Sequence, residues 1–280
     1  MRAAVFEDSA AGPAPTSGGL AKAGEAAAKI RIQGVSKTYR TKRGEVVALQ
    51  DIDLAVAQNE FVTLVGPSGC GKSTVLRIVS ALVRPTRGKV LLDGHALTTP
   101  TRDIGIVFQD AVLLPWRSVL ENVMLPVEIL RLDKNQYRQR AQLLLDLVGL
   151  QGFENRYPWE LSGGMQQRAS ICRALIYNPS ILLMDEPLAA LDAMTREELA
   201  FELLRIWDAH RMTILFVTHN ISEAVLLADR VVAMTPRPGR IARVIEVDLP
   251  RPRTLDMEFS QEFKKYTDEI RQVIFAAKKG

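Results

Sequence analysis

Ten residues in the first third of the chain read Val65-Gly66-Pro67-Ser68-Gly69-Cys70-Gly71-Lys72-Ser73-Thr74. They match the Gly-x-x-x-x-Gly-Lys-Ser pattern of a P-loop, a loop that binds the phosphates of a nucleotide triphosphate. The apolar residues 61–65 before it predict a buried strand, and residues 73–79 predict a helix. Strand, loop and helix therefore follow in the order that the motif requires. A Gly-rich turn without a ligand is the alternative, but such a match arises by chance in roughly 1% of chains of this length.

Each part of the P-loop has a role in holding phosphate. Its glycines let the backbone turn tightly with N–H groups facing inward, and the helix N-terminus adds positive partial charge. Lys72 supplies a full charge to the β- and γ-phosphates, and Ser73 supplies a hydroxyl ligand for Mg²⁺. The loop residues expected to contact nucleotide are Gly66, Pro67, Ser68, Gly69, Cys70, Gly71, Lys72, Ser73 and Thr74.

The composition is that of a mildly basic globular chain. Its 280 residues are 47% hydrophobic and carry a formal net charge of +4, which allows a sizeable core and does not indicate nucleic-acid binding. Cys70 and Cys172 lie far apart without metal-ligand spacing, so we expect a reducing, cytoplasmic compartment. No apolar run approaches the length of a membrane span, so we expect the protein to serve a membrane only through a partner.

Periodicity and composition divide the chain into five predicted segments. They are a flexible leader (1–28), an antiparallel β subdomain with the first part of a P-loop core (29–110), a helical subdomain (111–178), the second part of the core (179–247) and a C-terminal tail with an amphipathic helix (248–280). The predicted fold is therefore α/β, with an N-terminal antiparallel β subdomain and an inserted helical subdomain, and its core resembles that of the P-loop NTPases (RecA-like). Residues 259, 263, 266, 270 and 273 recur at the helical spacing of the tail.

Three short alternating runs, 30–32, 46–49 and 52–56, predict antiparallel strands beside the P-loop strand. Tyr39 is expected in the loop between the first two runs. An aromatic residue placed there, upstream of a P-loop, is a candidate to stack on an adenine ring. The alternative is a partly buried surface tyrosine.

Titratable or polar residues follow three further predicted strands at their carboxyl ends, where open α/β sheets bind ligands. Gln109 follows strand 104–108 and is a candidate for contact with Mg²⁺ or the attacking water, with a solvent-facing glutamine as the alternative. His219 follows strand 213–218 and is a candidate γ-phosphate sensor, with a structural histidine as the alternative. His95 and His210 are expected to be bystanders.

Two adjacent carboxylates, Asp185 and Glu186, end the apolar strand that starts at residue 181. Asp185 suits coordination of Mg²⁺, and Glu186 is placed to orient and deprotonate the water that attacks the γ-phosphate. Paired acids at a strand end cost free energy, because each raises the cost of ionising the other. A purely structural role is therefore disfavoured.

A second candidate anion site starts a helix in the predicted helical subdomain. Ser162 is the expected N-cap, and Gly163 and Gly164 expose the first backbone N–H groups of that helix. An ordinary helix start is the alternative. Residues 113–116, which are apolar, end in Trp116 and form a candidate partner-docking surface, with ordinary packing of Trp116 as the alternative.

The order and spacing of these motifs resemble those of the ATP-binding cassette (ABC) ATPases. The motifs that carry the resemblance are residues 66–74, Gln109, 161–166, 181–186, Asp192 and His219. The resemblance covers roughly residues 30–235. It implies that ATP and Mg²⁺ are the ligands and that a head-to-tail homodimer holds ATP between the P-loop of one subunit and residues 162–164 of the other. The implied roles are adenine stacking for Tyr39, the Q-loop for Gln109, the D-loop for Asp192 and the switch histidine for His219. The expected catalytic residues are Glu186, His219, Gln109 and Lys72, and the expected Mg²⁺ ligands are Ser73, Gln109 and Asp185.

Residues 114–117, 161–165 and 236–240 are similar to bacterial import subunits of the nitrate, sulfonate or taurine type. This resemblance implies an ATP-hydrolysing subunit on the cytoplasmic face of the inner membrane. Its partners would be transmembrane permease subunits and, indirectly, a periplasmic or extracellular solute-binding protein, with no nucleic acid. The alternatives are an importer of another solute such as a pyrimidine precursor, a subunit of an exporter or lipid-transfer system, and a non-transport ABC ATPase that remodels nucleic acid or protein complexes.

Three positions depart from the family pattern: Glu160, where Gln is usual, Ala189, where Gly or Ser is usual, and Asn220, where Asp is usual. None of the three removes a catalytic group. Glu160 is expected to add negative charge near a phosphate site and so to weaken ATP-driven closure.

Overall fold

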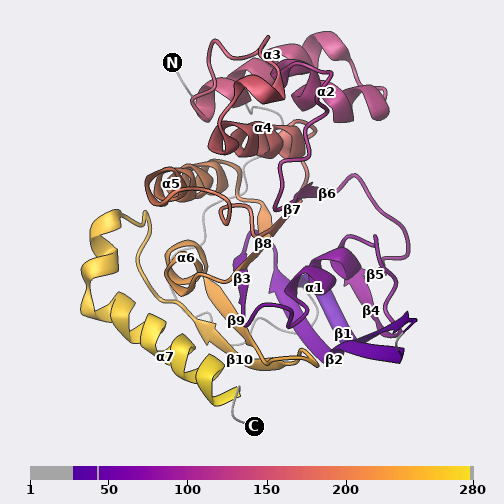
Figure 1. Ribbon diagram of the computed structural model, residues 1–280, viewed down its shortest axis with the longest axis vertical. Coiled ribbons are helices and arrows are strands. Elements are labelled where there is room, and N and C mark those ends of the chain that lie inside the picture. Colours follow the sequence, from indigo (N-terminus) through magenta and orange to yellow (C-terminus); the bar gives the residue numbers. More distant parts are fainter. Residues whose placement is uncertain (1–27, 43, 278–280) are drawn as a thin grey trace.

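The computed structural model describes residues 28–42 and 44–277 (Figure 1). The predicted leader lies outside this range except for Ala28, which begins β1. In chain order the strands and helices are β1 (Ala28–Thr41), β2 (Gly44–Ala57), β3 (Phe61–Val65), α1 (Lys72–Val79), β4 (Arg87–Leu92), β5 (His95–Ala96), β6 (Ile104–Val107), α2 (Val119–Ile129), α3 (Lys134–Leu147), α4 (Gly163–Leu175), β7 (Ile181–Asp185), α5 (Ala193–His210), β8 (Thr213–Thr218), α6 (Ile221–Leu227), β9 (Arg230–Met234), β10 (Ile241–Glu246) and α7 (Gln261–Ala277).

The central sheet has the strand order β10-β9-β3-β8-β7-β6. Strands β9, β3, β8, β7 and β6 are parallel, and β10 is antiparallel at one edge. Side chains of β3 alternate between two cores: Phe61 and Val65 pack with the core that contains α5 and α6, whereas Val62 and Leu64 pack with α1 and the smaller sheet. Strands buried on both faces need continuous apolar runs, which is why their sequences show no polar alternation. The α/β fold expected from the sequence is confirmed.

The smaller sheet is antiparallel, with the order β2-β1-β4-β5. Runs 46–49 and 52–56, predicted as separate strands, are parts of the single strand β2. The pairing with β1 shifts register along its length, and Asp51 adopts φ 48°, so an irregularity, not a turn, separates the two runs. Tyr39 was predicted in a loop and instead lies in β1, opposite Val46.

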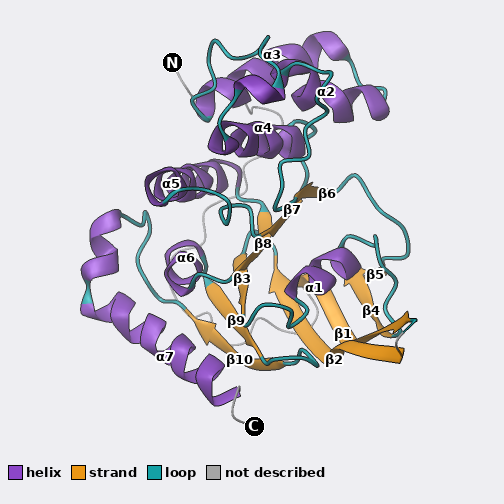
Figure 2. Cartoon of the chain, in the orientation of Figure 1, coloured by secondary structure: helices purple, strands orange, loops and turns teal. Residues whose placement is uncertain are grey.

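Residues 111–178 contain helices and loops but no strand (Figure 2). Asp133 caps α3 by accepting a hydrogen bond from the backbone N–H of Asn135. Helix α2 was not predicted, although Ser118 and Glu121 form a capping box at its start. In Figure 1, α2, α3 and α4 form a group on one side of the central sheet.

The last element of the described residues is α7, which contacts α6 and β10 and buries Phe263 and Ile270. Phe259 was predicted as part of this helix but lies in the preceding 3₁₀ turn, Leu255–Phe259, with 84% of its surface exposed. None of the helices in the described part of the chain is long and apolar enough to span a membrane.

Candidate active site

The carboxyl ends of β3, β7 and β8, neighbours in the central sheet, bring most of the predicted site residues to one edge (Figure 1). The P-loop follows β3, Asp185 ends β7 and Glu186 follows it, and His219 follows β8. Side chains that are more than 100 residues apart in sequence therefore meet. This juxtaposition is a consequence of parallel strand pairing, since parallel strands end on the same side of a sheet.

Two P-loop glycines have backbone angles that other residues adopt only with strain: Gly69 has φ 74° and Gly71 has φ 107°. A Cβ atom on Gly71 would also lie 2.6 Å from Cδ2 of Leu49. Cys70, between them, is 1% exposed, and burial raises the pKa of its thiol. The loop is thus shaped by glycine, and its cysteine stays protonated near neutral pH.

The ammonium of Lys72 is turned back onto the loop that carries it. Nζ donates hydrogen bonds to the carbonyl oxygens of Gly66 (2.9 Å) and Pro67 (3.2 Å) and lies 3.7 Å from Oε1 of Glu186. Lys72 is only 4% exposed, so these oxygens compensate for its lost hydration. The site therefore holds a desolvated positive charge next to the carboxylate of Glu186.

Ser73 and Asp185 form a pair of oxygen ligands. The hydroxyl of Ser73 donates a 2.8 Å hydrogen bond to Oδ1 of Asp185. Burial raises the pKa of Asp185, and the neighbouring Glu186 raises it further, while the Ser73 hydrogen bond opposes the shift. In the described residues no group of three or more His, Cys, Asp and Glu side chains forms a metal cluster. Both side chains fit Mg²⁺, which takes few protein ligands and completes its shell with phosphate and water.

Glu186 and His219 are in direct contact. Nδ1 of His219 lies 2.9 Å from Oε2 of Glu186, and the imidazole remains 60% exposed. Glu186 has φ 47°, a left-handed conformation, and its N–H donates to the carbonyl of Val217. Such strain costs on the order of 1–3 kcal/mol and is concentrated at active sites. The arrangement gives a carboxylate a fixed direction with a cation on one side and a titratable ring on the other.

The second candidate anion site is not part of this cluster. Ser162 caps α4 by accepting from the N–H of Met165, as predicted, and Asp192 caps α5 by accepting from the N–H of Thr195. A Cβ on Gly164 would lie 2.6 Å from Cγ2 of Thr195, so the starts of α4 and α5 are in close contact. Hydrogen bonds from Thr195 lower the pKa of Asp192. Among the described residues, neither Ser162 nor Asp192 bonds to the P-loop.

Gln109 and Tyr39 also remain separate from the cluster. Gln109 is exposed and lies beyond the end of β6, outside the hydrogen bonds that join the described site residues. Tyr39 is half-buried, with Nζ of Lys37 5.0 Å from its ring centroid. Trp116 is 70% exposed, which excludes the alternative that it is ordinary core packing.

Glu160 does not carry the uncompensated charge that its position suggested. Its carboxylate accepts from the N–H of Tyr157 (2.7 Å) and from Nη1 of Arg156 (3.0 Å), and these hydrogen bonds lower its pKa. The electrostatic reason for expecting weaker closure is therefore reduced. Among the other departures, Ala189 is half-buried in the loop after β7, and Asn220 caps α6.

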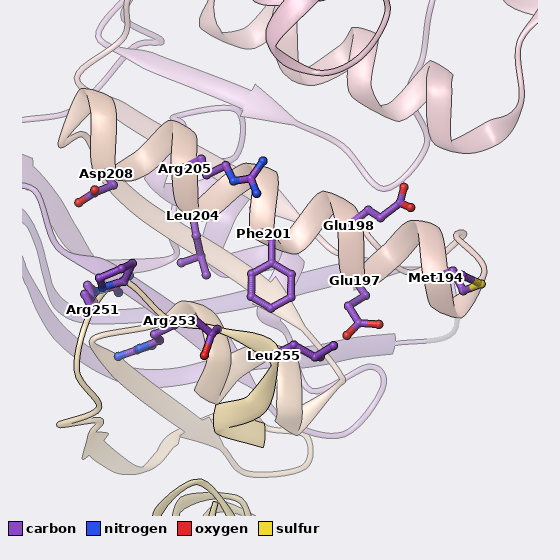
Figure 3. Close-up of a pocket in the computed structure, with 12 residues that line it drawn as sticks. Met194, Glu197, Glu198, Phe201, Leu204, Arg205, Asp208, Arg251, Arg253 and Leu255 are labelled. Atoms are coloured by element: carbon purple, nitrogen blue, oxygen red, sulfur yellow. The ribbon is translucent and has the colours of Figure 1, made fainter. Parts of the chain in front are cut away.

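A groove of about 560 Å³ lies elsewhere, between α5 and the segment 251–255 (Figure 3). Phe201, Leu204 and Leu255 supply apolar surface to it, and Glu197 and Arg205 supply charge. None of the predicted site residues lines this groove. Concavity alone therefore does not locate the predicted site in a single copy of the chain.

Arg196 and Glu223 were not identified from the sequence. They bond to the segments that carry Glu186 and His219. Glu223 comes three residues after the N-cap Asn220, which is the spacing of a capping box. That spacing was the available signal. The side chain of Glu223 instead accepts hydrogen bonds from the hydroxyl of Thr218 and from the side-chain amide of Asn220.

Comparison with known proteins gives consistent matches. The family model described as "ABC transporter" matches residues 49–189. An uncharacterized ABC transporter ATP-binding protein of Methanocaldococcus jannaschii is 48% identical over 88% of this chain and 91% of its own. The nitrate import ATP-binding protein NrtD of Synechococcus elongatus is 48% identical over 78% of this chain and 81% of its own. The aliphatic sulfonates import ATP-binding protein SsuB of Bacillus cereus is 42% identical over 84% and 93%.

Solved structures show the same similarity. A dimeric structure of the ATP-binding cassette MJ0796, in a post-hydrolysis state bound to ADP and Pi, superposes with a TM-score of 0.71 at 35% identity. It covers 79% of this chain and 100% of the matched chain. A second dimeric structure of that cassette gives the same values.

Proposed function

Since this chain belongs to the ABC transporter family, we propose that it is the ATP-hydrolysing subunit of a bacterial importer for a small anionic solute of the nitrate, sulfonate or taurine type. The observation that carries the proposal is the contact of Glu186 with both Lys72 and His219 at the carboxyl edge of the central sheet. The names of its relatives supply the solute class. A conserved fold alone would not, because one fold supports many functions.

The proposed chemistry follows from these contacts. The P-loop N–H groups and Lys72 bind the β- and γ-phosphates, and Glu186 accepts a proton from the water whose oxygen attacks the γ-phosphorus. The bond from that phosphorus to the bridging oxygen breaks, which releases ADP and inorganic phosphate. His219 orients Glu186 and contacts the γ-phosphate. Ser73, Asp185 and Gln109 are the residues that would hold Mg²⁺, which neutralises phosphate charge when bound.

A second copy of the chain completes the proposed site. Ser162, Gly163, Gly164 and Asp192 lie at the starts of α4 and α5 and do not bond to the P-loop of their own chain in the described structure. In a head-to-tail homodimer these residues would cover the nucleotide on the P-loop of the partner. The dimeric structures of the similar cassette support a homodimer.

The proposed partners are transmembrane permease subunits and, through them, a solute-binding protein, with this chain peripheral on the cytoplasmic face of the membrane. Three exposed apolar side chains near Gln109 in the sequence, Phe108, Val112 and Trp116 (40%, 60% and 70% exposed), support a docking surface there, since such side chains mark contact sites when they form a patch. ATP-driven closure of two copies would move this surface, and hydrolysis would release it.

Affinity purification of the full chain from detergent-solubilised native membranes tests the transport role. Mass spectrometry should identify a multi-span permease, whose binding protein is then screened with nitrate, taurine and alkanesulfonates. Recovery of only soluble or nucleic-acid-associated proteins would contradict the importer assignment and leave the ATPase assignment intact. Binding of a pyrimidine precursor in place of the anions would contradict the solute class alone.

A further inference from the structure

An ion pair between Arg196 and Glu223 connects two loops of the candidate active site. Arg196 lies near the start of α5, and Glu223 lies near the start of α6. Nε of Arg196 is 3.6 Å from Oε1 of Glu223, and the two side chains are 32% and 11% exposed. Charges at this depth are screened less than surface charges, and loss of one leaves the other uncompensated.

Arg196 fixes the loop between Glu186 and Asp192. Its Nε donates to the carbonyl of Leu188 (3.2 Å), and its Nη2 donates to the carbonyl of Leu191 (2.8 Å). The guanidinium is planar, with its donors at fixed angles, so these two bonds define the path of the loop. The loop begins at Glu186 and ends at Asp192, the N-cap of α5.

Glu223 holds both chain neighbours of His219. Its Oε2 accepts a 2.7 Å hydrogen bond from the hydroxyl of Thr218, and its Oε1 accepts a 3.2 Å hydrogen bond from the amide of Asn220. The N–H of Asn220 also donates to Oγ1 of Thr218. The turn that carries His219 is therefore tied on both sides to one buried carboxylate.

We propose that Arg196 and Glu223 are positioning residues that couple the loop ending at Asp192 to the turn carrying His219. Neither side chain touches the reacting atoms. Arg196 holds the loop that begins at Glu186, and Glu223 holds the turn that carries His219. The ion pair between them keeps Glu186 and His219 within contact distance. It also gives a route by which contact of Asp192 with a second copy changes the position of His219. This inference rests on the proposed ATPase function, because the relative position of Glu186 and His219 matters only if both residues act on ATP.

Steady-state ATP hydrolysis by Glu223→Gln, with Glu60→Gln as the matched control, tests the coupling. Glu60 also pairs with an arginine, Arg230, and is similarly buried, with 12% of its side chain exposed. It precedes β3 and so lies at the opposite edge of the sheet. Glu223→Gln should lower kcat about tenfold with KM for ATP changed by less than about twofold, because misplacement affects the chemical step more than nucleotide binding. Glu60→Gln should change neither.

Arg196→Lys is the second variant, since a single ammonium cannot reproduce the fork of bonds to Leu188 and Leu191. Arg196→Lys should lower kcat with little change in KM for ATP, as Glu223→Gln should. The double variant should lose no more of its kcat than either single variant, because the pair acts as one unit. A kcat of Glu223→Gln equal to that of Glu60→Gln, or additive losses in the double variant, would overturn the coupling. If Glu223→Gln does not fold, an unaltered kcat in Arg196→Lys overturns it. Absence of hydrolysis by the wild-type chain would instead contradict the proposed function.

Discussion

Oε2 of Glu186 lies 2.9 Å from Nδ1 of His219, although the two residues follow different strands, β7 and β8. The contact depends on the parallel pairing of those strands, in which Asp185 is opposite Val217. Glu186 reaches it in a left-handed backbone conformation, so the fold supports a strained residue at this point. The predictions below follow from this contact and the groups around it.

Replacement of Tyr39 by Ala should raise the dissociation constant for ATP about tenfold or more, because stacking on a base contributes about 1–3 kcal/mol. The kcat should change little, since Tyr39 is in β1 and not among the residues at the carboxyl edge of the central sheet. Calorimetric titration with ATP and steady-state kinetics give the two values. Tyr39→Phe is the control and should bind like the wild type. An unchanged affinity in Tyr39→Ala would remove Tyr39 from the nucleotide site.

Asp185→Asn should make the nucleotide-free chain more stable at neutral pH while hydrolysis in Mg²⁺ falls about 100-fold or more. Burial raises the pKa of Asp185, so ionising it costs free energy in the folded state. The wild-type chain therefore loses stability relative to the variant as pH rises from the unfolded pKa through the raised folded pKa. At lower pH, Asp185 is protonated and the difference should disappear.

Thermal unfolding of both proteins across this pH range checks the prediction. A wild-type chain that is more stable than Asp185→Asn at neutral pH would show that the Ser73 hydrogen bond and nearby cations outweigh desolvation. Equal hydrolysis by the two proteins would exclude Asp185 as a Mg²⁺ ligand.

Gly164→Ala should destabilise the chain by about 1–3 kcal/mol, because a new Cβ would lie 2.6 Å from Cγ2 of Thr195 and force α4 away from α5. Gly163→Ala is the matched control, since no atom lies within 4 Å of its new Cβ. The melting temperatures of the two variants measure the difference. Equal melting temperatures would mean that the starts of α4 and α5 separate without cost.

Much of the fold and of the candidate site followed from the sequence, since buried parallel strands need unbroken apolar runs and ligand-binding groups follow their carboxyl ends. Asp185, Glu186 and His219 were named on that basis and Ser73 from the P-loop pattern. The structure places all four at one edge of the sheet. The caps Asp133 and Ser162 were also predictable, because a short polar side chain before an apolar-periodic run satisfies free N–H groups.

Other features could not be predicted because tertiary contacts decide them. The irregularity at Asp51 has the same polar signal as a turn, so one strand was read as two. Tyr39 was placed in a loop because β1 continues past its apolar run only through pairing with β2. Helix α2 contains Pro126, and because proline disfavours a helix interior, the sequence did not indicate that helix. The bonds of Arg196 to Leu188 and Leu191 and its pairing with Glu223 join separate elements, and no periodicity marks such a pair.

The groove beside α5 gave no guidance to the site, which the proposed head-to-tail dimer would explain. Ser162 and Asp192 cap α4 and α5, and among the described residues neither bonds to the P-loop of its own chain; in the proposed dimer they would cover the nucleotide of the partner. Sequence motifs therefore marked this site better than the shape of one copy did.

The most direct test is single-turnover ATP hydrolysis by Glu186→Gln beside the wild-type chain, with the oligomeric state measured in Mg²⁺ and ATP. Gln preserves the shape of the side chain but cannot accept the proton of the attacking water. The variant should bind ATP, accumulate as a closed dimer and hydrolyse at least about 100-fold more slowly. Near-normal turnover by Glu186→Gln would contradict the assignment of Glu186 as the base.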